Sequence, residues 1–285
     1  MTGVHTVNPF RLPELGGNEL ILRVCSGLAL APIALATAFI GNWWFAAFWG
    51  VAALGTFWEW NSLMPISDRR SILTIGALSL VIGVVLAADG YVIAGLMALT
   101  TGTVATTAMA PAQTRLWLAA GVPYCGSVAV APIILRTDPE YGFASILFLF
   151  AIVWGTDIIA YFAGRAIGGP KLLPQVSPKK TWSGAIAGTG AAVVAGIIVT
   201  QAIGVGRSVT LAFLAAALSV CAQGGDLLES FFKRRFGAKD SSRLIPGHGG
   251  LMDRLDAFVA AGVIAAAIGI ARGGLQAPGR GLLVW

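Results

Sequence analysis

The sequence predicts an all-α, polytopic transmembrane bundle. Of its 285 residues, 56% are hydrophobic and only 11% are charged, whereas soluble domains carry roughly 25% charged residues. Apolar stretches close to the ~20 residues that cross a bilayer recur along the whole chain. The Lys and Arg residues are divided unevenly between alternate loops. Together these observations predict about nine spans in one membrane domain, with the N-terminus in the cytosol.

The chain begins with a polar segment, residues 1–22, which has no apolar core typical of a signal peptide. We expect a retained, loosely ordered tail followed by a single membrane-embedded domain over residues 23–285. Turn residues such as Gly41-Asn42, Asp89-Gly90 and Asp138-Pro139 interrupt the apolar runs. The predicted spans are 23–40, 42–64, 72–88, 90–108, 115–135, 142–164, 183–203, 209–229 and 251–271.

Orientation follows from the basic residues, because cytosolic loops accumulate Lys and Arg. Of the 19 basic residues, fourteen fall in the tail or in loops on the same side. The opposite side holds only Arg136, Arg207, Arg272 and Arg280, and Arg254 falls just inside the last span. The loops 165–182 and 230–250 carry most of the excess. The chemistry is therefore expected in the C-terminal half, at about 150–272, on the cytosolic side.

The net charge of +6 does not indicate a nucleic-acid partner. The basic residues of the chain are not interleaved with aromatic residues on a polar surface, as nucleic-acid binding requires. Membrane lipids and anionic small molecules explain the charge better. We therefore expect no nucleic acid among the partners.

Three carboxylates lie in or near apolar spans: Asp157, Asp226 and Glu229. An acidic group at the bilayer centre costs about 2.5–3.5 kcal/mol, so each needs a cation or a metal ion as partner. Asp226, Glu229 and Lys233 share one helical face at i, i+3 and i+7. Asp253 and Asp256 repeat the i, i+3 spacing at the start of the last span. Such hard oxygen ligands favour Mg²⁺, although compensation of the helix dipole would also explain Asp253 and Asp256.

The segment between these acids is rich in basic residues and then in glycine. Gly249 and Gly250 permit close backbone approach to an anion, while Lys and Arg neutralise its charge. His248 could donate to a phosphate or brace the turn. No GxxxxGK[ST] motif occurs in the chain, so this is not a Walker loop. Lys179 and Lys180 are further candidates for phosphate contact, with ordinary positive-inside anchoring as the alternative.

The stretch SFFKRRFGAKDSSRLIPGHGGLMDRLD, residues 230–256, resembles the signature of the phosphatidate cytidylyltransferases, or CDP-diacylglycerol synthases. Further similarity lies in residues 154–184, WGTDIIAYFAGRAIGGPKLLPQVSPKKTWSG, and in residues 223–230, QGGDLLES. The N-terminal half resembles the family only in its hydrophobic layout and in small features such as Glu59. Ser183 departs from the family, which commonly has Glu after the SPKKT segment, so we assign no site role there.

The resemblance implies an enzyme that converts CTP and phosphatidic acid into CDP-diacylglycerol and pyrophosphate. It also implies a multi-pass protein of the bacterial cell membrane with its active site facing the cytosol, and it makes a homodimer plausible. We expect Mg²⁺ as cofactor and leave a second cation open. The catalytic candidates are Asp226, Asp253, Asp256, Lys233 and Lys239; the substrate-binding candidates are Lys179, Lys180, Arg234, His248, Gly249, Gly250 and Arg254; the metal ligands are Asp226, Asp253, Asp256 and Glu229.

Two other classes of protein remain as alternatives. A cation-coupled transporter would also place carboxylates in membrane helices, but it would not explain the basic glycine loop. A CTP-dependent lipid kinase would transfer the γ-phosphoryl group and release CDP instead of pyrophosphate. Labels on the α- and γ-phosphates distinguish the two enzyme classes.

Overall fold

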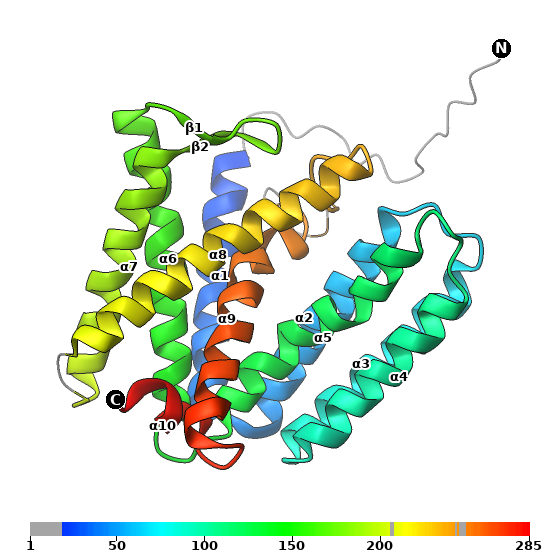
Figure 1. Ribbon diagram of the computed structural model, residues 1–285, viewed down its shortest axis with the longest axis horizontal. Helices are drawn as coiled ribbons and strands as arrows, with labels where there is room; N and C mark the ends of the chain where they lie inside the picture. Colours follow the sequence, from blue (N-terminus) through cyan, green and yellow to red (C-terminus); the bar gives the residue numbers. More distant parts are fainter. Residues whose placement is uncertain (1–18, 206–207, 243, 245–248) are drawn as a thin grey trace.

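The computed structural model describes residues 19–205, 208–242, 244 and 249–285. These residues are mostly helical, with one short β-hairpin (Figure 1). The helices are α1 (Glu19–Ile40), α2 (Asn42–Ser62), α3 (Arg69–Ala88), α4 (Val92–Ala108), α5 (Arg115–Arg136), α6 (Gly142–Ile167), α7 (Trp182–Ala202), α8 (Val209–Arg235), α9 (Met252–Gly273) and α10 (Pro278–Leu283), and the strands are β1 (Lys171–Leu173) and β2 (Ser177–Thr181).

Helices α1 to α9 coincide with the nine predicted segments to within four residues, except that α8 continues to Arg235 instead of ending near 229. Six of them, α3 and α5 to α9, are long and apolar enough to cross a membrane. Within the described residues, α4 and the segment Leu30–Ile40 of α1 are shorter apolar helices. The chain is thus an integral membrane protein with a helical bundle, and the number nine stays a prediction.

The helical fold class is confirmed, and the structure adds one feature that was not predicted: a short hairpin occupies part of the predicted 165–182 loop. β1 and β2 pair antiparallel, with Lys171 opposite Thr181. Thr181 then caps α7 by accepting a hydrogen bond from the backbone N–H of Gly184 at 3.2 Å. The hydroxyl of Ser183 donates to the carbonyl of Gly168. The base of the hairpin is therefore fixed between α6 and α7.

Small residues hold α6 and α7 close together under this hairpin. A Cβ added at Gly184 would lie 2.6 Å from the carbonyl oxygen of Ala160, and one at Gly188 would lie 2.8 Å from that of Thr156. Membrane helices use such small residues for close backbone approach. Aromatic packing joins α2 to α8, since Trp60 of α2 stacks on Phe232 of α8 with ring centroids 3.8 Å apart.

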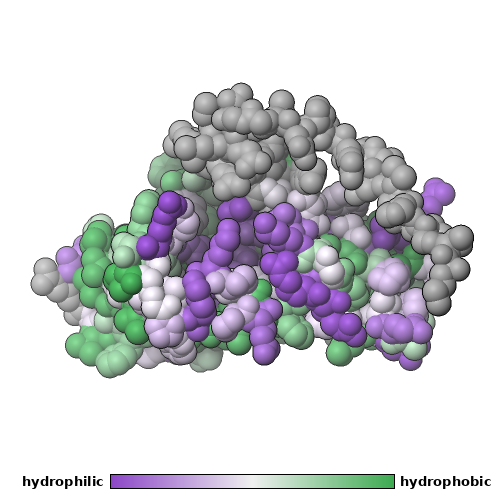
Figure 2. Space-filling view, turned by 90° about the horizontal axis from the view of Figure 1, so that it is seen from above, coloured by the Kyte–Doolittle hydropathy of each residue, from purple (hydrophilic) through white to green (hydrophobic). Residues whose placement is uncertain are grey.

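The two ends of the bundle differ (Figure 1). The hairpin, the C-terminal end of α8 and the N-terminal end of α9 lie at one end, and α10 lies at the other. Viewed from the hairpin end, hydrophilic residues run across the middle of the molecule, and apolar residues gather most plainly at its left edge (Figure 2). The residues singled out by the sequence belong to the elements that meet at this end.

Candidate functional site

A cavity of about 990 Å³ opens among α1, α2, α6, the hairpin, α7, α8 and α9. This volume is at the upper end of ordinary ligand pockets, about 300–1,000 Å³. Its apolar and aromatic lining residues, which we call the apolar wall, include Leu30, Phe48, Trp49, Phe150, Trp154 and Phe258. Its charged lining residues, which we call the charged wall, are the acids Asp157, Asp226, Asp253 and Asp256, and the cations Arg165, Lys171, Lys179, Lys180 and Arg254.

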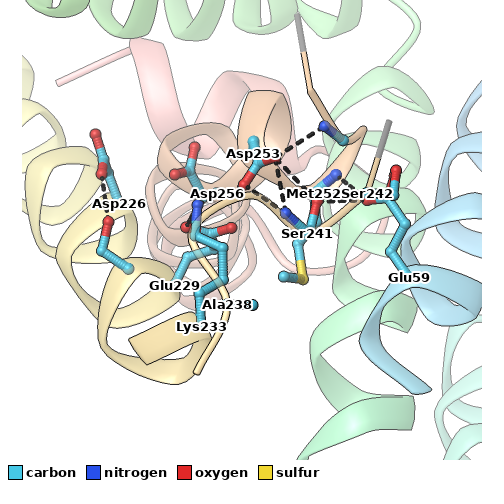
Figure 3. Close-up of polar contacts among 12 residues, drawn as sticks. Glu59, Asp226, Glu229, Lys233, Ala238, Ser241, Ser242, Met252, Asp253 and Asp256 are labelled. Carbon is cyan, nitrogen blue, oxygen red and sulfur yellow. Dashed lines mark hydrogen bonds and ion pairs between the residues drawn. The ribbon is translucent and has the colours of Figure 1, made fainter. Parts of the chain in front are cut away.

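Asp226 joins the hairpin to α8. Its Oδ2 lies 2.5 Å from Nζ of Lys180, and both side chains are about one-third exposed, at 30% and 27%. The hydroxyl of Ser230 donates to Asp226 Oδ1 at 3.4 Å (Figure 3). The predicted phosphate contact and the predicted metal ligand are therefore direct neighbours, and both face the cavity.

Lys233 forms a second ion-paired group between α8 and α9. Its Nζ lies 2.7 Å from Oε2 of Glu229, one turn earlier on the same helix, and also contacts Oδ1 of Asp253. The exposed fractions of these side chains are only 10%, 1% and 10%. Lys233 and Glu229 do not belong to the cavity wall. Through this ion pair, Lys233 acts on the orientation of Asp253.

Asp253 also fixes the segment that precedes α9. Its Oδ2 accepts hydrogen bonds from the backbone N–H of Gly250 at 2.8 Å and from the backbone N–H and hydroxyl of Ser241 at 3.1 and 3.0 Å. Figure 3 shows these bonds converging on Asp253 from both sides of the loop. Asp253 thus lines the cavity and also holds the loop that precedes α9.

Asp256 lies one turn further into α9 and is almost fully buried, with 7% exposure. Gly225 lets α8 come close at this point, because a Cβ there would lie 2.6 Å from Cβ of Ala260. Asp157, Asp226 and Asp256 all line the cavity. A bound cation would stabilise like charges that share one cavity.

The remaining candidates fall into two groups. Lys179 and Arg254 line the cavity, and their substrate-binding role stays a prediction. Arg234 and Lys239 are exposed and are not among its lining residues, and Arg234 donates to the carbonyl of Ala238 at 3.1 Å. His248 lies outside the described residues. The substrate-binding roles of Arg234 and His248 and the catalytic role of Lys239 stay predictions.

The two glycines serve different purposes. Gly249 has φ = 83°, in the region that favours glycine. Gly250 has no positive φ, but a Cβ there would lie 2.9 Å from both carboxylate oxygens of Glu59. The N–H of Gly250 donates to Asp253. In this arrangement it stabilises a carboxylate of the protein and not a substrate anion.

Glu59 of α2 is the residue that the sequence reasoning undervalued. Its side chain is 0% exposed. It accepts hydrogen bonds from the hydroxyls of Ser241 and Ser242 and from the backbone N–H groups of Leu251 and Met252. The criterion applied to Asp226 would have found it, because Glu59 is an acid within the apolar run FAAFWGVAALGTFWEW.

The donor chemistry of the cavity fits Mg²⁺. Among the described residues, no three His, Cys, Asp or Glu side chains form a complete metal-binding cluster. Mg²⁺ does not need one, because it is usually held by one or two carboxylates together with substrate phosphates and water. The mutually repelling acids at the charged wall supply such oxygens, and the neighbouring cations suit the phosphates.

Comparison with known proteins gives a consistent match. Residues 21–270 match the model of the cytidylyltransferase family. The chain is 41% identical over 248 residues to the phosphatidate cytidylyltransferase of Brucella abortus, covering 87% of this chain and 92% of that protein. Shorter matches include the phosphatidate cytidylyltransferases of Haemophilus influenzae, at 46% over 132 residues (44% of this chain, 45% of that protein), and Staphylococcus epidermidis, at 44% over 119 residues (41% and 46%).

Proposed function

The chain belongs to the cytidylyltransferase family, and from this premise we propose that it transfers the cytidylyl group of CTP to phosphatidic acid in phospholipid biosynthesis. The products are CDP-diacylglycerol and pyrophosphate. The observation that carries the proposal is a cavity lined both by charged residues, which suit phosphates, and by apolar residues, which suit acyl chains. A nucleotide and a lipid can meet there.

The reaction requires two anions to approach each other. An oxygen of the lipid phosphate attacks the α-phosphorus of CTP, a new P–O bond forms, and the bond from the α-phosphorus to the oxygen bridging the α- and β-phosphates breaks. The electron pair leaves with pyrophosphate. Since the lipid phosphate is already anionic near neutral pH, no strong general base is needed. Charge neutralisation and alignment are the main catalytic tasks.

The cavity residues suit these tasks. Lys179, Lys180 and Arg254 contact the phosphates, and Lys180 can exchange the carboxylate of Asp226 for a substrate oxygen. Asp226, Asp253 and Asp256 would hold Mg²⁺, with Glu229 behind them; when bound, this ion would neutralise charge on the reacting phosphates. Lys233 keeps Asp253 in place through their ion pair.

The finer topology belongs to the same proposal. Nine spans with a cytosolic N-terminus put the hairpin and the α8–α9 segment on the cytosolic side, where CTP is available. The excess of Lys and Arg in those segments supports this orientation. The relatives named above are bacterial, which supports a location in the bacterial cell membrane. The resemblance to the family adds a homodimer to the proposal.

Product analysis tests the function. Purified protein in detergent is given phosphatidic acid, Mg²⁺ and CTP labelled on either the α- or the γ-phosphate. We expect the α-label in a CDP-lipid and the γ-label in pyrophosphate, with turnover lost in excess EDTA and restored by added Mg²⁺. A γ-label on the lipid would indicate a kinase, and activity only in sealed vesicles would indicate a transporter.

A further inference from the structure

A buried carboxylate from the N-terminal half holds the segment that leads into α9. Glu59 Oε1 accepts from the hydroxyl of Ser242 at 2.5 Å and from the N–H of Leu251 at 2.8 Å. Its Oε2 accepts from the hydroxyl of Ser241 at 3.0 Å and from the N–H of Met252 at 2.7 Å. Among the described residues, its recorded partners are hydroxyls and amides, without a Lys or Arg. Glu59 therefore satisfies backbone groups that the first turn of a helix leaves unpaired.

The same contacts reach the cavity through Ser241. The hydroxyl of Ser241 lies 3.0 Å from Oε2 of Glu59 and 3.0 Å from Oδ2 of Asp253. Because a hydroxyl carries one proton, it can donate to only one of these carboxylates at a time. The N–H of Ser241 also donates to Asp253. Glu59 and Asp253 thus both form hydrogen bonds with the same loop (Figure 3).

We propose that Glu59 is a positioning residue for the cytidylyl transfer, which makes this inference dependent on the proposed function. Glu59 is not part of the cavity wall and does not touch substrate. It fixes the start of α9, and Asp253, Arg254 and Asp256 project from that turn into the cavity. The N-terminal half of the chain thereby controls the geometry of the charged wall.

Glu59→Gln is the sharpest test because it keeps the shape and changes the hydrogen bonding. A glutamine amide presents two donors where Glu59 presents an acceptor oxygen, so one pair of partners at the loop loses its acceptor. We expect kcat per folded molecule to fall about tenfold or more, as when groups that orient catalytic ligands are removed. Ser242→Ala, which removes one donor to Glu59, should lower kcat less.

Thr56→Val is the matched control. Thr56 is equally buried on α2, and among the described residues its hydroxyl bonds only the carbonyl of Ala52 in the same helix, at 2.8 Å. We expect its kcat per folded molecule to stay near that of the unchanged protein. If Glu59→Gln also keeps kcat within about threefold, or if Thr56→Val loses as much, the positioning role is wrong.

Amide hydrogen exchange supplies a readout that does not depend on activity. In Glu59→Gln, the amides of Leu251 and Met252 should exchange faster, while those of α5 and α7 stay protected. The inference would be overturned if Leu251 and Met252 exchanged no faster than in the unchanged protein, or if exchange became faster throughout the bundle. If the unchanged protein makes no CDP-lipid, the proposed function fails, whereas the exchange experiment still decides whether Glu59 holds the loop.

Discussion

The two ends of the bundle use charged side chains for different purposes. At the hairpin end, Lys180 and Lys233 pair with carboxylates from other elements beside a cavity. At the α10 end, Arg136 and Arg272 donate to backbone carbonyls, and Asp138 accepts from backbone amides. A backbone partner is lost only if a helix end opens, but a side-chain partner can be exchanged for a substrate charge. We therefore expect charges at the first end to serve chemistry and those at the second to serve folding.

The largest difference is expected between two Asp→Asn substitutions. Asp226→Asn removes the charge that faces Lys180 in the cavity, and we expect turnover to fall by about 10³-fold with little change in melting temperature. Asp138→Asn, at the other end, should lower the melting temperature because Asp138 is buried and its Oδ2 accepts from the N–H of Arg280 at 2.8 Å. Its turnover per folded molecule should stay normal.

Both quantities come from one preparation of each variant, with CDP-lipid formation as the activity and thermal unfolding in detergent as the stability. Near-normal turnover in correctly inserted Asp226→Asn would remove this residue from the catalytic group. A strong loss of turnover in well-folded Asp138→Asn would show that the two ends are not functionally separate.

A smaller effect is expected from two substitutions that each remove one positive charge at the hairpin end. Lys180→Met takes away the cation beside Asp226, and we expect turnover to fall about 10- to 100-fold. Arg235→Met changes an exposed side chain in the last turn of α8 that does not line the cavity, so turnover should change little. Equal losses in both variants would mean that the overall positive charge matters, and not the contact with Asp226.

Much of the fold could be predicted because the membrane imposes length and apolarity on each helix. The segments that became α2 and α5 were located to within two residues at either end by turn residues and apolar runs. The hairpin was missed, because β1 and β2 are only three and five residues long and their segment read as a basic loop. Its conformation depends on contacts with α6 and α7 that no local pattern encodes.

The site was predictable to the extent that it uses charged residues in a recognisable stretch. Asp226, Asp253 and Asp256 do line one cavity, in agreement with the expected convergence of acids from two helices. The partners of each acid were not predictable. Lys233 pairs with Glu229 behind the wall and with Asp253 in it. Glu59 reaches the loop from a helix more than 180 residues away in sequence. Only the folded chain decides which buried acid meets which donor.

Arg136→Ala should have the smallest effect on turnover, although its side chain is as extensively bonded as those at the cavity. Nε of Arg136 donates to the carbonyl of Ala38 at 2.6 Å and Nη2 to that of Phe39 at 3.2 Å, so it closes the C-terminal end of α1, whose carbonyls have no partner within the helix. Losing these bonds should cost about 1.5–3 kcal/mol of stability and lower the melting temperature.

Arg280→Ala is the control. It removes a charge at the same end from an exposed side chain, and should leave the melting temperature nearly unchanged. Since neither residue lines the cavity, turnover per folded molecule should remain normal in both; a loss confined to Arg136→Ala would mean that the end of α1 is coupled to the apolar wall, where Leu30 and Ala34 of the same helix lie.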